Sequence, residues 1–220
     1  MNDTERYYTA AEVRAMDRHA IEQLGIPAFE LMHRAGTAAF NALLARWPDT
    51  QRLLVFCGTG NNGGDGFVIA ALARDAGLDA QIYLVGDAAN IKGTAREALI
   101  FAEARGLELH DAQTLPDFTS VSHATVVVDA LLGTGLTGDL RPAFRHVIEA
   151  INRSGLPVLA VDIPSGLCSD TGGILGACVK AELTVTFIGR KRGLVSGAGP
   201  AYCGTVVFDD LGVDTSDMKK

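Results

Sequence analysis

Residues 58–66 read G-T-G-N-N-G-G-D-G and follow directly on the apolar run at 53–57. The motif therefore places five glycines, two adjacent amides and one acid at the end of a buried strand. Glycines let the backbone turn sharply and approach a ligand closely, and such a loop at a helix N-terminus binds anions. A purely structural turn would need only one or two glycines. We predict a ligand-binding loop here, with a helix following at about 66–76.

The same motif contains the G-x-G-x-x-G spacing of dinucleotide-binding loops. That fingerprint expects an acid about 20 residues further on, at the end of the second strand. Asp79 precedes this strand, and Asp87 comes late after it. Asp65 also places a carboxylate in the first turn of the helix, which disfavours a pyrophosphate at the same place. The sequence therefore argues against an ordinary NAD(P)-linked dehydrogenase.

Two later strands also end in acids. An apolar strand at 125–128 ends in Asp129, followed by A-L-L-G-T-G-L-T-G-D, and another at 158–161 ends in Asp162, followed by I-P-S-G. In an open α/β sheet, ligands bind in the crevice at the carboxyl ends of the strands. Taken alone, Asp129 could cap a helix and Asp162 could lie in a turn. Because three strands deliver polar groups to one edge, we predict a functional site there.

Apolar patterning predicts the elements that must position these groups. Helices are expected at about 10–24, 28–47, 66–76, 92–105 and 141–153. Strands are expected at about 53–57, 81–85, 107–110, 125–129, 157–161, 183–188 and 205–208. Near-continuous apolar strands that alternate with helices predict an α/β, three-layer Rossmann-like sandwich with a mostly parallel central sheet and helices on both faces. No helix pattern separates the last two strands, so we expect an antiparallel edge there.

The first two helices form an N-terminal helix pair. Thr9 and Glu12 have the spacing of a capping box at the start of the first helix, and Gly25 ends it. We expect a single domain over residues 1–220, with a polar tail from about residue 214 that is frayed.

Composition and charge restrict the class of protein. The 19 basic and 26 acidic residues give a net charge of −7, and the lack of a long basic run argues against nucleic acid and membrane surfaces as partners. The four cysteines lack C-x-x-C spacing and favour reduced thiols in a cytoplasmic protein over a disulfide framework. The polar N-terminus and the absence of an 18-residue apolar stretch predict neither a secretory signal nor a membrane span.

Together the motifs resemble those of the YjeF N-terminal domain family, the NAD(P)H-hydrate epimerases. The resemblance rests on G-x-G-N-N-G-G-D-G at 58–66, D-A-L-L-G-T-G at 129–135 and D-I-P-S-G at 162–166. The segments at 26–32 and 197–200 are also similar to the family. The similarity covers nearly the whole chain, and three motifs in this order are far more specific than a lone glycine fingerprint.

The resemblance implies an isomerase that repairs hydrated nicotinamide cofactors. Its substrates would be NADHX and NADPHX, which are NADH and NADPH hydrated at C6 of the dihydropyridine ring as R and S epimers. Loss of water to a cation and readdition to the other face would interconvert them. That reaction needs an acid/base within hydrogen-bond reach of the hydroxyl, and the cation favours a nearby carboxylate. We predict that Asp162 has this catalytic role, with Asp65 as the second candidate.

The resemblance also implies a potassium ion as cofactor, held by Asn62, Asp129 and Ser165. Amide, carboxylate and hydroxyl oxygens are hard ligands that suit such a cation. The five histidines are scattered along the chain, which argues against a zinc or iron site. Backbone N–H groups of the glycine-rich turn at 133–135 suit phosphate oxygens. The substrate-binding residues implied by the family are Asn61, Asn62, Gly63, Gly64, Asp65, Gly133, Thr134, Gly135, Leu136, Thr137, Gly138, Asp139 and Asp162.

A non-catalytic alternative stays open, because this fold also serves as a dimerisation, scaffold or nucleotide-sensing module. Such a module need not keep the acids and amide that this chain has kept. In many bacteria the domain is fused to an NAD(P)HX dehydratase, so we expect a fused or separate dehydratase as partner. The family also implies a homodimer, although the apolar faces of the N-terminal helices could equally cover the sheet.

Overall fold

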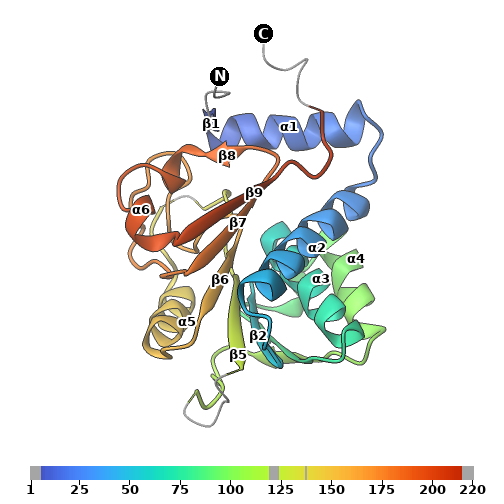
Figure 1. The fold of residues 1–220 in the computed structure, drawn as a ribbon, viewed down its shortest axis with the longest axis vertical. Helices are drawn as coiled ribbons and strands as arrows, with labels where there is room; N and C mark the ends of the chain where they lie inside the picture. Colours follow the sequence, from blue (N-terminus) through green and yellow to red (C-terminus); the bar gives the residue numbers. More distant parts are fainter. Residues whose placement is uncertain (1–5, 119–123, 137, 215–220) are drawn as a thin grey trace.

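The computed structural model describes residues 6–118, 124–136 and 138–214, and its centre is a seven-stranded sheet. The strand order is β4-β3-β2-β5-β6-β7-β9, and every neighbouring pair is parallel. The predicted three-layer α/β fold is confirmed (Figure 1). The strands are β2 (Arg52–Cys57), β3 (Asp79–Leu84), β4 (Leu109–Asp111), β5 (Thr125–Ala130), β6 (Val158–Val161), β7 (Leu183–Phe187) and β9 (Thr205–Asp209).

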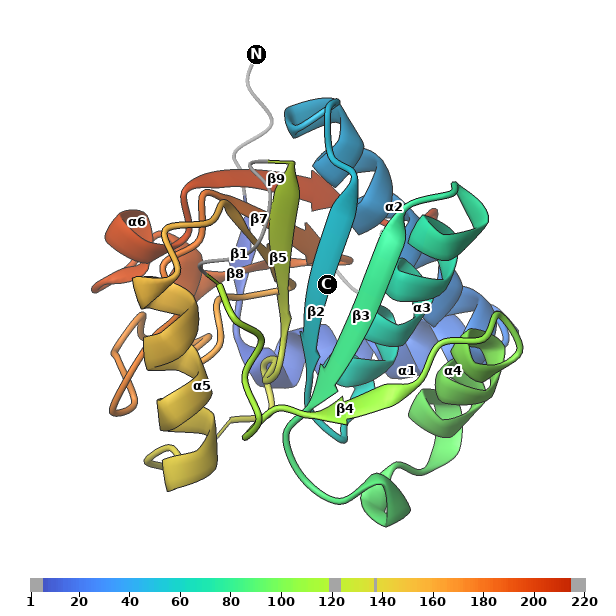
Figure 2. The same ribbon diagram turned by 90° about the horizontal axis from the view of Figure 1, so that it is seen from below.

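Helices cover both faces of this sheet. Figure 2 shows α5 on one side of β5 and β2, and α3 and α4 on the other. Side chains on β2 alternate accordingly, with Leu53 and Val55 packed toward α2, α3 and α4 and Leu54 and Phe56 toward α5. The helices on the two faces are α2 (Ala28–Arg46), α3 (Asn61–Asp75), α4 (Gly93–Glu103), α5 (Pro142–Arg153) and the short α6 (Gly199–Tyr202).

The order of the strands reverses at β2. From β2 the chain moves outward through β3 and β4, and it then returns to β5 on the other side of β2. The carboxyl ends of β2 and β5 therefore diverge into helices on opposite faces and leave a crevice between them. The glycine-rich motif follows β2, and Asp129 lies within β5 next to its end. The topology thus places both predicted motifs at the switch point.

An N-terminal helix closes the carboxyl end of the sheet. Helix α1 (Ala10–Glu22) lies across the end toward which β2 and β3 point (Figure 2). The predicted capping box is present: the Thr9 hydroxyl accepts from the Glu12 amide at 3.2 Å, and the Glu12 carboxylate accepts from the Thr9 amide at 2.7 Å. Before it, the two-residue strand β1 (Tyr7–Tyr8) pairs with β8 (Arg190–Lys191). The sequence patterns did not predict these two short strands.

Two further predictions about elements were wrong. Helix α3 begins at Asn61, five residues before the predicted start, so the amides and glycines form its first turns and Asp65 lies in the second turn. The strand β9 is parallel to β7, whereas an antiparallel edge was expected. The crossover between them contains β8, a single 3-10 turn (Arg192–Leu194) and the four-residue α6, which are too short to leave a helical pattern in the sequence.

All four cysteines are free thiols, as predicted. Among the described helices, none is both long and apolar enough to cross a membrane. The part of the predicted polar tail beyond residue 214 lies outside the described residues.

Candidate active site

A cavity of about 360 Å³ opens at the carboxyl end of the sheet, between α1, α2 and the ends of the central strands. Its wall is mixed: apolar side chains come mainly from α1 and α2, and polar groups come mainly from the strand ends. Such a mixture suits a ring that carries polar substituents. Its polar and glycine lining is Arg14, Asp17, Asn61, Asn62, Asp65, Thr94, Gly133, Thr134, Gly135, Asp162 and Lys191.

Asp162 follows β6 in a strained backbone conformation. Its φ is +67°, and the Ile163 amide donates to the Val161 carbonyl at 2.8 Å, which closes a γ-turn of the rarer hand. Its own amide donates to the Val185 carbonyl at 2.7 Å on the neighbouring strand. Non-glycine residues in this region cost about 1–3 kcal/mol and concentrate at functional sites. The fold therefore holds Asp162 in a costly geometry that aims its carboxylate into the cavity.

Lys191 is the cation that fixes this carboxylate. The side chain of Lys191 is 1% exposed, and its ammonium donates to Asp162 Oδ1, to Thr186 Oγ1 at 3.0 Å and to the Phe187 carbonyl at 2.9 Å. All three ammonium donors are thus used. Within the described residues, every hydrogen bond to the Asp162 carboxylate ends on Oδ1, from Lys191, Thr186 and the Phe187 amide. This leaves Oδ2 available to a bound molecule.

Two more carboxyl groups share the cavity. Burial raises the pKa of Asp65 well above its usual value, and the charges of Asp162 and Asp17 raise it further. Burial also raises the pKa of Asp17 to about 6, with the Asp162 charge as the second cause. Lys191 opposes both shifts. One ammonium therefore faces three carboxyl groups, and the cluster holds protons near neutral pH.

A second polar cluster lies beneath the cavity floor. Asp129 is fully buried, and its two oxygens accept from the Ser165 hydroxyl at 2.6 Å and the Ser165 amide at 2.8 Å. The Leu132 amide donates to Ser165 Oγ at 2.9 Å, which ties the segment after β5 to the segment after β6. Burial raises the pKa of Asp129 to about 6, although the Ser165 hydrogen bonds lower it. Two of the three predicted potassium ligands therefore touch each other.

Asn62 completes this cluster from α3. Its Nδ2 is buried without a hydrogen-bond partner, a rare and costly state for an amide. A Cβ added at Gly133 would lie 3.3 Å from the Asn62 side chain, so the two residues are in close contact. The unsatisfied Nδ2 of Asn62 indicates a place for a further polar group next to Gly133. The described residues contain no group of three His, Cys, Asp or Glu side chains arranged as metal ligands.

The glycines of the first motif mainly allow close packing. A Cβ added at Gly58 would lie 2.1 Å from the Leu131 carbonyl oxygen, and one at Gly63 would lie 2.0 Å from the Gly58 carbonyl oxygen. A Cβ at Gly66 would lie 2.6 Å from Cys57 Sγ and from a methyl group of β5. These contacts hold the start of α3 against the ends of β2 and β5. The close approach aims the amides and Asp65 at the cavity.

The predicted substrate-binding residues divide into four groups. Seven line the main cavity: Asn61, Asn62, Asp65, Gly133, Thr134, Gly135 and Asp162. Leu136 and Asp139 line a second cavity of about 370 Å³, which shares Gly133 and Gly135 with the first. Gly63 and Gly64 are buried within α3, and Gly138 is an exposed turn residue with positive φ. Thr137 lies outside the described residues.

Sequence reasoning missed three charged residues of the cavity, which are Arg14, Asp17 and Lys191. Asp17 is one of several polar residues on an amphipathic helix, and Lys191 stands between two arginines that precede a glycine. Neither lies in a recognisable motif. The two-residue strand that contains Lys191 could have pointed to this residue, but so short a strand leaves no recognisable pattern in the sequence.

Comparisons with known proteins agree with this architecture. A family model described as YjeF-related protein N-terminus matches residues 28–193. The chain is 47% identical, over 95% of its length, to the bifunctional NAD(P)H-hydrate repair enzyme Nnr of Coxiella burnetii, of which it covers 42%. It is 39% identical, over 95% of its length, to the NAD(P)H-hydrate epimerase of Limosilactobacillus fermentum, of which it covers 99%.

The chain thus spans about two fifths of the length of the bifunctional relative and almost all of the epimerase. The fold is similar to the crystal structure of yeast ynu0, YNL200c, with a TM-score of 0.76 at 19% identity, over 86% of this chain and 83% of that one. The three strand-end motifs, the family match and the identity to these relatives lead to one conclusion: the chain belongs to the family described as YjeF-related protein N-terminus.

Proposed function

We propose that this protein is an isomerase that interconverts the R and S epimers of NADHX and NADPHX. One observation carries the proposal: a carboxylate, Asp162, is held by a buried lysine and a strained turn so that one oxygen faces a cavity at the switch point of the sheet. Relatives named NAD(P)H-hydrate epimerase and NAD(P)H-hydrate repair enzyme support the choice of substrate.

The chemistry matches what the cavity offers. The C6 hydroxyl leaves as water after protonation, the ring nitrogen donates its lone pair to form an iminium cation, and water then adds to C6 and releases a proton. Asp162 lies where a carboxylate could exchange that proton and stabilise the cation. The apolar lining from Val13, Leu31 and Met32 suits the faces of the nicotinamide ring.

The rest of the dinucleotide has a place beside the first cavity. Helix α3 begins at the cavity with Asn61 and Asn62, and Gly60 at its N-cap supplies no side-chain capping bond, so its first amides can bind an anion. The glycine-rich turn at Gly133 and Gly135 borders both cavities and can offer further N–H groups to phosphate oxygens. A dinucleotide that lies across this turn would place its two halves in the two cavities.

We also propose potassium as the cofactor, held by Asn62, Asp129 and Ser165. The donor set fits, because among the described residues no cation pairs with the fully buried Asp129 carboxylate and no hydrogen-bond partner reaches Asn62 Nδ2. A rotated Asn62 amide would present its oxygen in place of the orphaned nitrogen. When bound, the ion would supply a positive charge that orders the three strand-end segments and attracts substrate phosphates.

The other predictions stay proposals. A dehydratase, fused or separate, is the proposed partner, because several relatives are named bifunctional and are longer than this chain. A homodimer and a cytoplasmic location follow from the family resemblance alone.

The decisive experiment measures the epimerisation of purified R-NADHX by chromatography, in potassium and then in sodium. An enzyme-free blank sets the baseline, because the epimers also interconvert spontaneously. We expect a clear rate excess in potassium, lost by about 100-fold or more in Asp162→Asn. The exposed acid Asp49, at the opposite end of the sheet, supplies the matched control Asp49→Asn.

Two results would change the proposal. Normal epimerisation by Asp162→Asn would remove Asp162 from the mechanism. A folded wild-type protein that binds NADHX without accelerating its epimerisation would instead indicate a nucleotide-sensing or scaffold module of the same fold.

A further inference from the structure

Inversion at C6 requires proton chemistry on both faces of the nicotinamide ring. The hydroxyl leaves from one face, and water must add to the opposite face for the other epimer to form. A carboxylate on one side of a planar cation reaches only one of these positions. The following inference rests on the proposed epimerase function and concerns the group that serves the second face.

Helix α1 contributes a second carboxyl group to the wall of the cavity. Val13, Asp17 and Ile21 are spaced one helical turn apart and all line the cavity. Asp17 is the only acid of this stripe. Asp65 and Asp162, by contrast, both come from segments that follow strands of the sheet.

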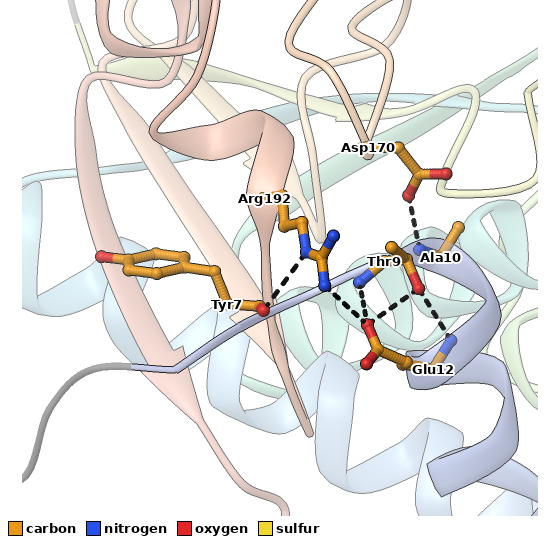
Figure 3. Close-up of polar contacts among 6 residues, drawn as sticks. All are labelled: Tyr7, Thr9, Ala10, Glu12, Asp170 and Arg192. Carbon is orange, nitrogen blue, oxygen red and sulfur yellow. Dashed lines mark hydrogen bonds and ion pairs between the residues drawn. The ribbon is translucent and has the colours of Figure 1, made fainter.

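Contacts at both sides of this stripe fix the position of α1. A Cβ added at Gly189, in the turn after β7, would lie 3.2 Å from Val13 and 3.3 Å from the Met16 sulfur, so the helix rests directly on the turn. At its first turn, the Ala10 amide donates to Asp170 at 2.6 Å (Figure 3). The wall that carries Asp17 is therefore built into the fold.

We propose that Asp17 is a second catalytic acid/base, which acts on the face of the ring opposite to Asp162. A ring that enters the cavity between α1 and the sheet would have the Asp162 carboxylate on its sheet side and the Asp17 carboxyl on its helix side. Each carboxyl group then exchanges a proton with the C6 hydroxyl of one epimer.

The electrostatics of the cluster support this division of roles. Asp17 has a pKa of about 6, raised by burial and by the charge of Asp162, so its carboxyl group can both give up and take up a proton close to neutral pH. Asp162 is bonded to the Lys191 ammonium, which holds its carboxylate in place as the partner base. Asp65 from α3 and Arg14 from α1 are the other charged residues that line this cavity.

The step balances with one proton shared by the two carboxyl groups. Asp17 donates its proton to the departing hydroxyl, the C6–O bond breaks with both electrons on oxygen, and the ring nitrogen forms the iminium bond. Water then adds to C6 from the other face, and Asp162 takes the proton that this water loses. The reverse direction exchanges the two roles.

Oxygen-18 water separates the two faces experimentally. In Asp17→Asn, we expect epimerisation of NADHX to fall about 100-fold. Asp162 would still remove and replace the hydroxyl on its own face, so mass spectrometry should show label entering one epimer with retained configuration. In Asp162→Asn, label should enter the other epimer. The exposed Glu22 on the same helix supplies the matched control Glu22→Gln, which should leave both rates unchanged.

If Asp17→Asn epimerises NADHX as fast as an active wild-type protein does, the role of Asp17 is overturned. The proposed function then stays intact. Loss of both epimerisation and label exchange in a folded Asp17→Asn protein would also overturn it, because the two faces would then not act separately. Thermal unfolding checks that the variant folds, and Asp17→Ser provides a second variant with the same expected pattern. A wild-type protein without activity would reject the proposed function itself.

Discussion

Asp162 is tightly constrained, because it combines positive φ with an ion pair to a buried lysine. A buried lysine is costly unless it is paired and its protons are all bonded. Lys191 meets both conditions through Asp162, Thr186 and the Phe187 carbonyl. The pair therefore acts as one unit, in which Lys191 positions the carboxylate and leaves one oxygen for chemistry.

Removal of Lys191 should separate its structural role from its effect on Asp162. We expect Lys191→Met to destabilise the protein by about 3–5 kcal/mol, because it leaves a carboxylate without its partner. Epimerisation should also fall about 100-fold, since the carboxylate loses its fixed orientation and charge compensation. Urea unfolding and the NADHX assay measure the two effects.

The double variant Lys191→Met/Asp162→Asn tests the same pair. It should recover most of the stability and none of the activity, because no unpaired charge stays buried. The exposed Lys180 supplies the control Lys180→Met, which should change neither quantity. Equal stability of Lys191→Met and the wild type would refute the coupling of the two residues.

At the residue scale, the strand-end acids and Ser165 could be predicted from sequence. Each follows or ends an apolar strand, and sheet topology brings such positions together. Asp17 and Lys191 could not, because their roles depend on where α1 and the turn after β7 pack. That packing is a tertiary property with no local signature.

At the scale of elements, α1 carries one wall of the cavity and is fastened at its first turn. The Glu12 carboxylate accepts from Thr9 and lies 3.4 Å from the Arg192 guanidinium (Figure 3). The Arg192 Nε donates to the Tyr7 carbonyl at 3.5 Å. These contacts and the β1–β8 pairing join the segment before α1 to the strand that contains Lys191.

Loss of the cap should loosen this helix before the rest of the fold. Thr9→Ala should lower stability by about 1 kcal/mol, because the Glu12 amide loses its acceptor. Hydrogen exchange should show that α1 opens at a lower free energy than the central strands do. Epimerisation should fall as well, because Asp17 is carried by α1.

Thr9→Ser keeps the hydroxyl and is the matched control for this helix. It should behave like the wild type in exchange and activity. Equal opening free energies for α1 and the central strands in Thr9→Ala would show that α1 unfolds together with the sheet, contrary to this prediction.

The elements that could be predicted are those whose apolar patterns are long. The seven strands of the sheet and the helices at both faces were found from such patterns. The start of α3 was misplaced because asparagine and glycine are poor helix formers, and here the close packing of Gly63 and Gly66 outweighs propensity. The direction of β9 relative to β7 was predicted wrongly because the crossover to β9 has almost no regular structure.

At the scale of the whole molecule, polar side chains join the segments that follow β5 and β6, and close packing holds α3 against them. Ser165 connects the segment after β6 to Asp129 and to Leu132 after β5, and Asn62 brings in α3 after β2. The junction has a buried negative charge and an unsatisfied amide. A bound cation at this point would stabilise the whole sheet edge.

Potassium should therefore raise the melting temperature more than sodium does. At about tenfold excess over the dissociation constant, binding contributes on the order of 1.4 kcal/mol, or roughly 3 °C for a chain of this size. Asn62→Ala should abolish the difference between the two ions, and the exposed Asn90 supplies the control Asn90→Ala, which should keep it. Equal melting temperatures in the two salts would argue against a potassium site.

The left-handed backbone at position 162 also limits how this family can change over evolutionary time. Aspartate, asparagine and glycine accept that conformation most readily, whereas branched or bulky residues are strongly disfavoured. Asparagine keeps the size and backbone preference of Asp162 and removes only its charge. Under the proposed mechanism, one conservative substitution would therefore remove catalysis and keep the fold, and this offers a short route from a repair enzyme to a protein that only binds the nucleotide.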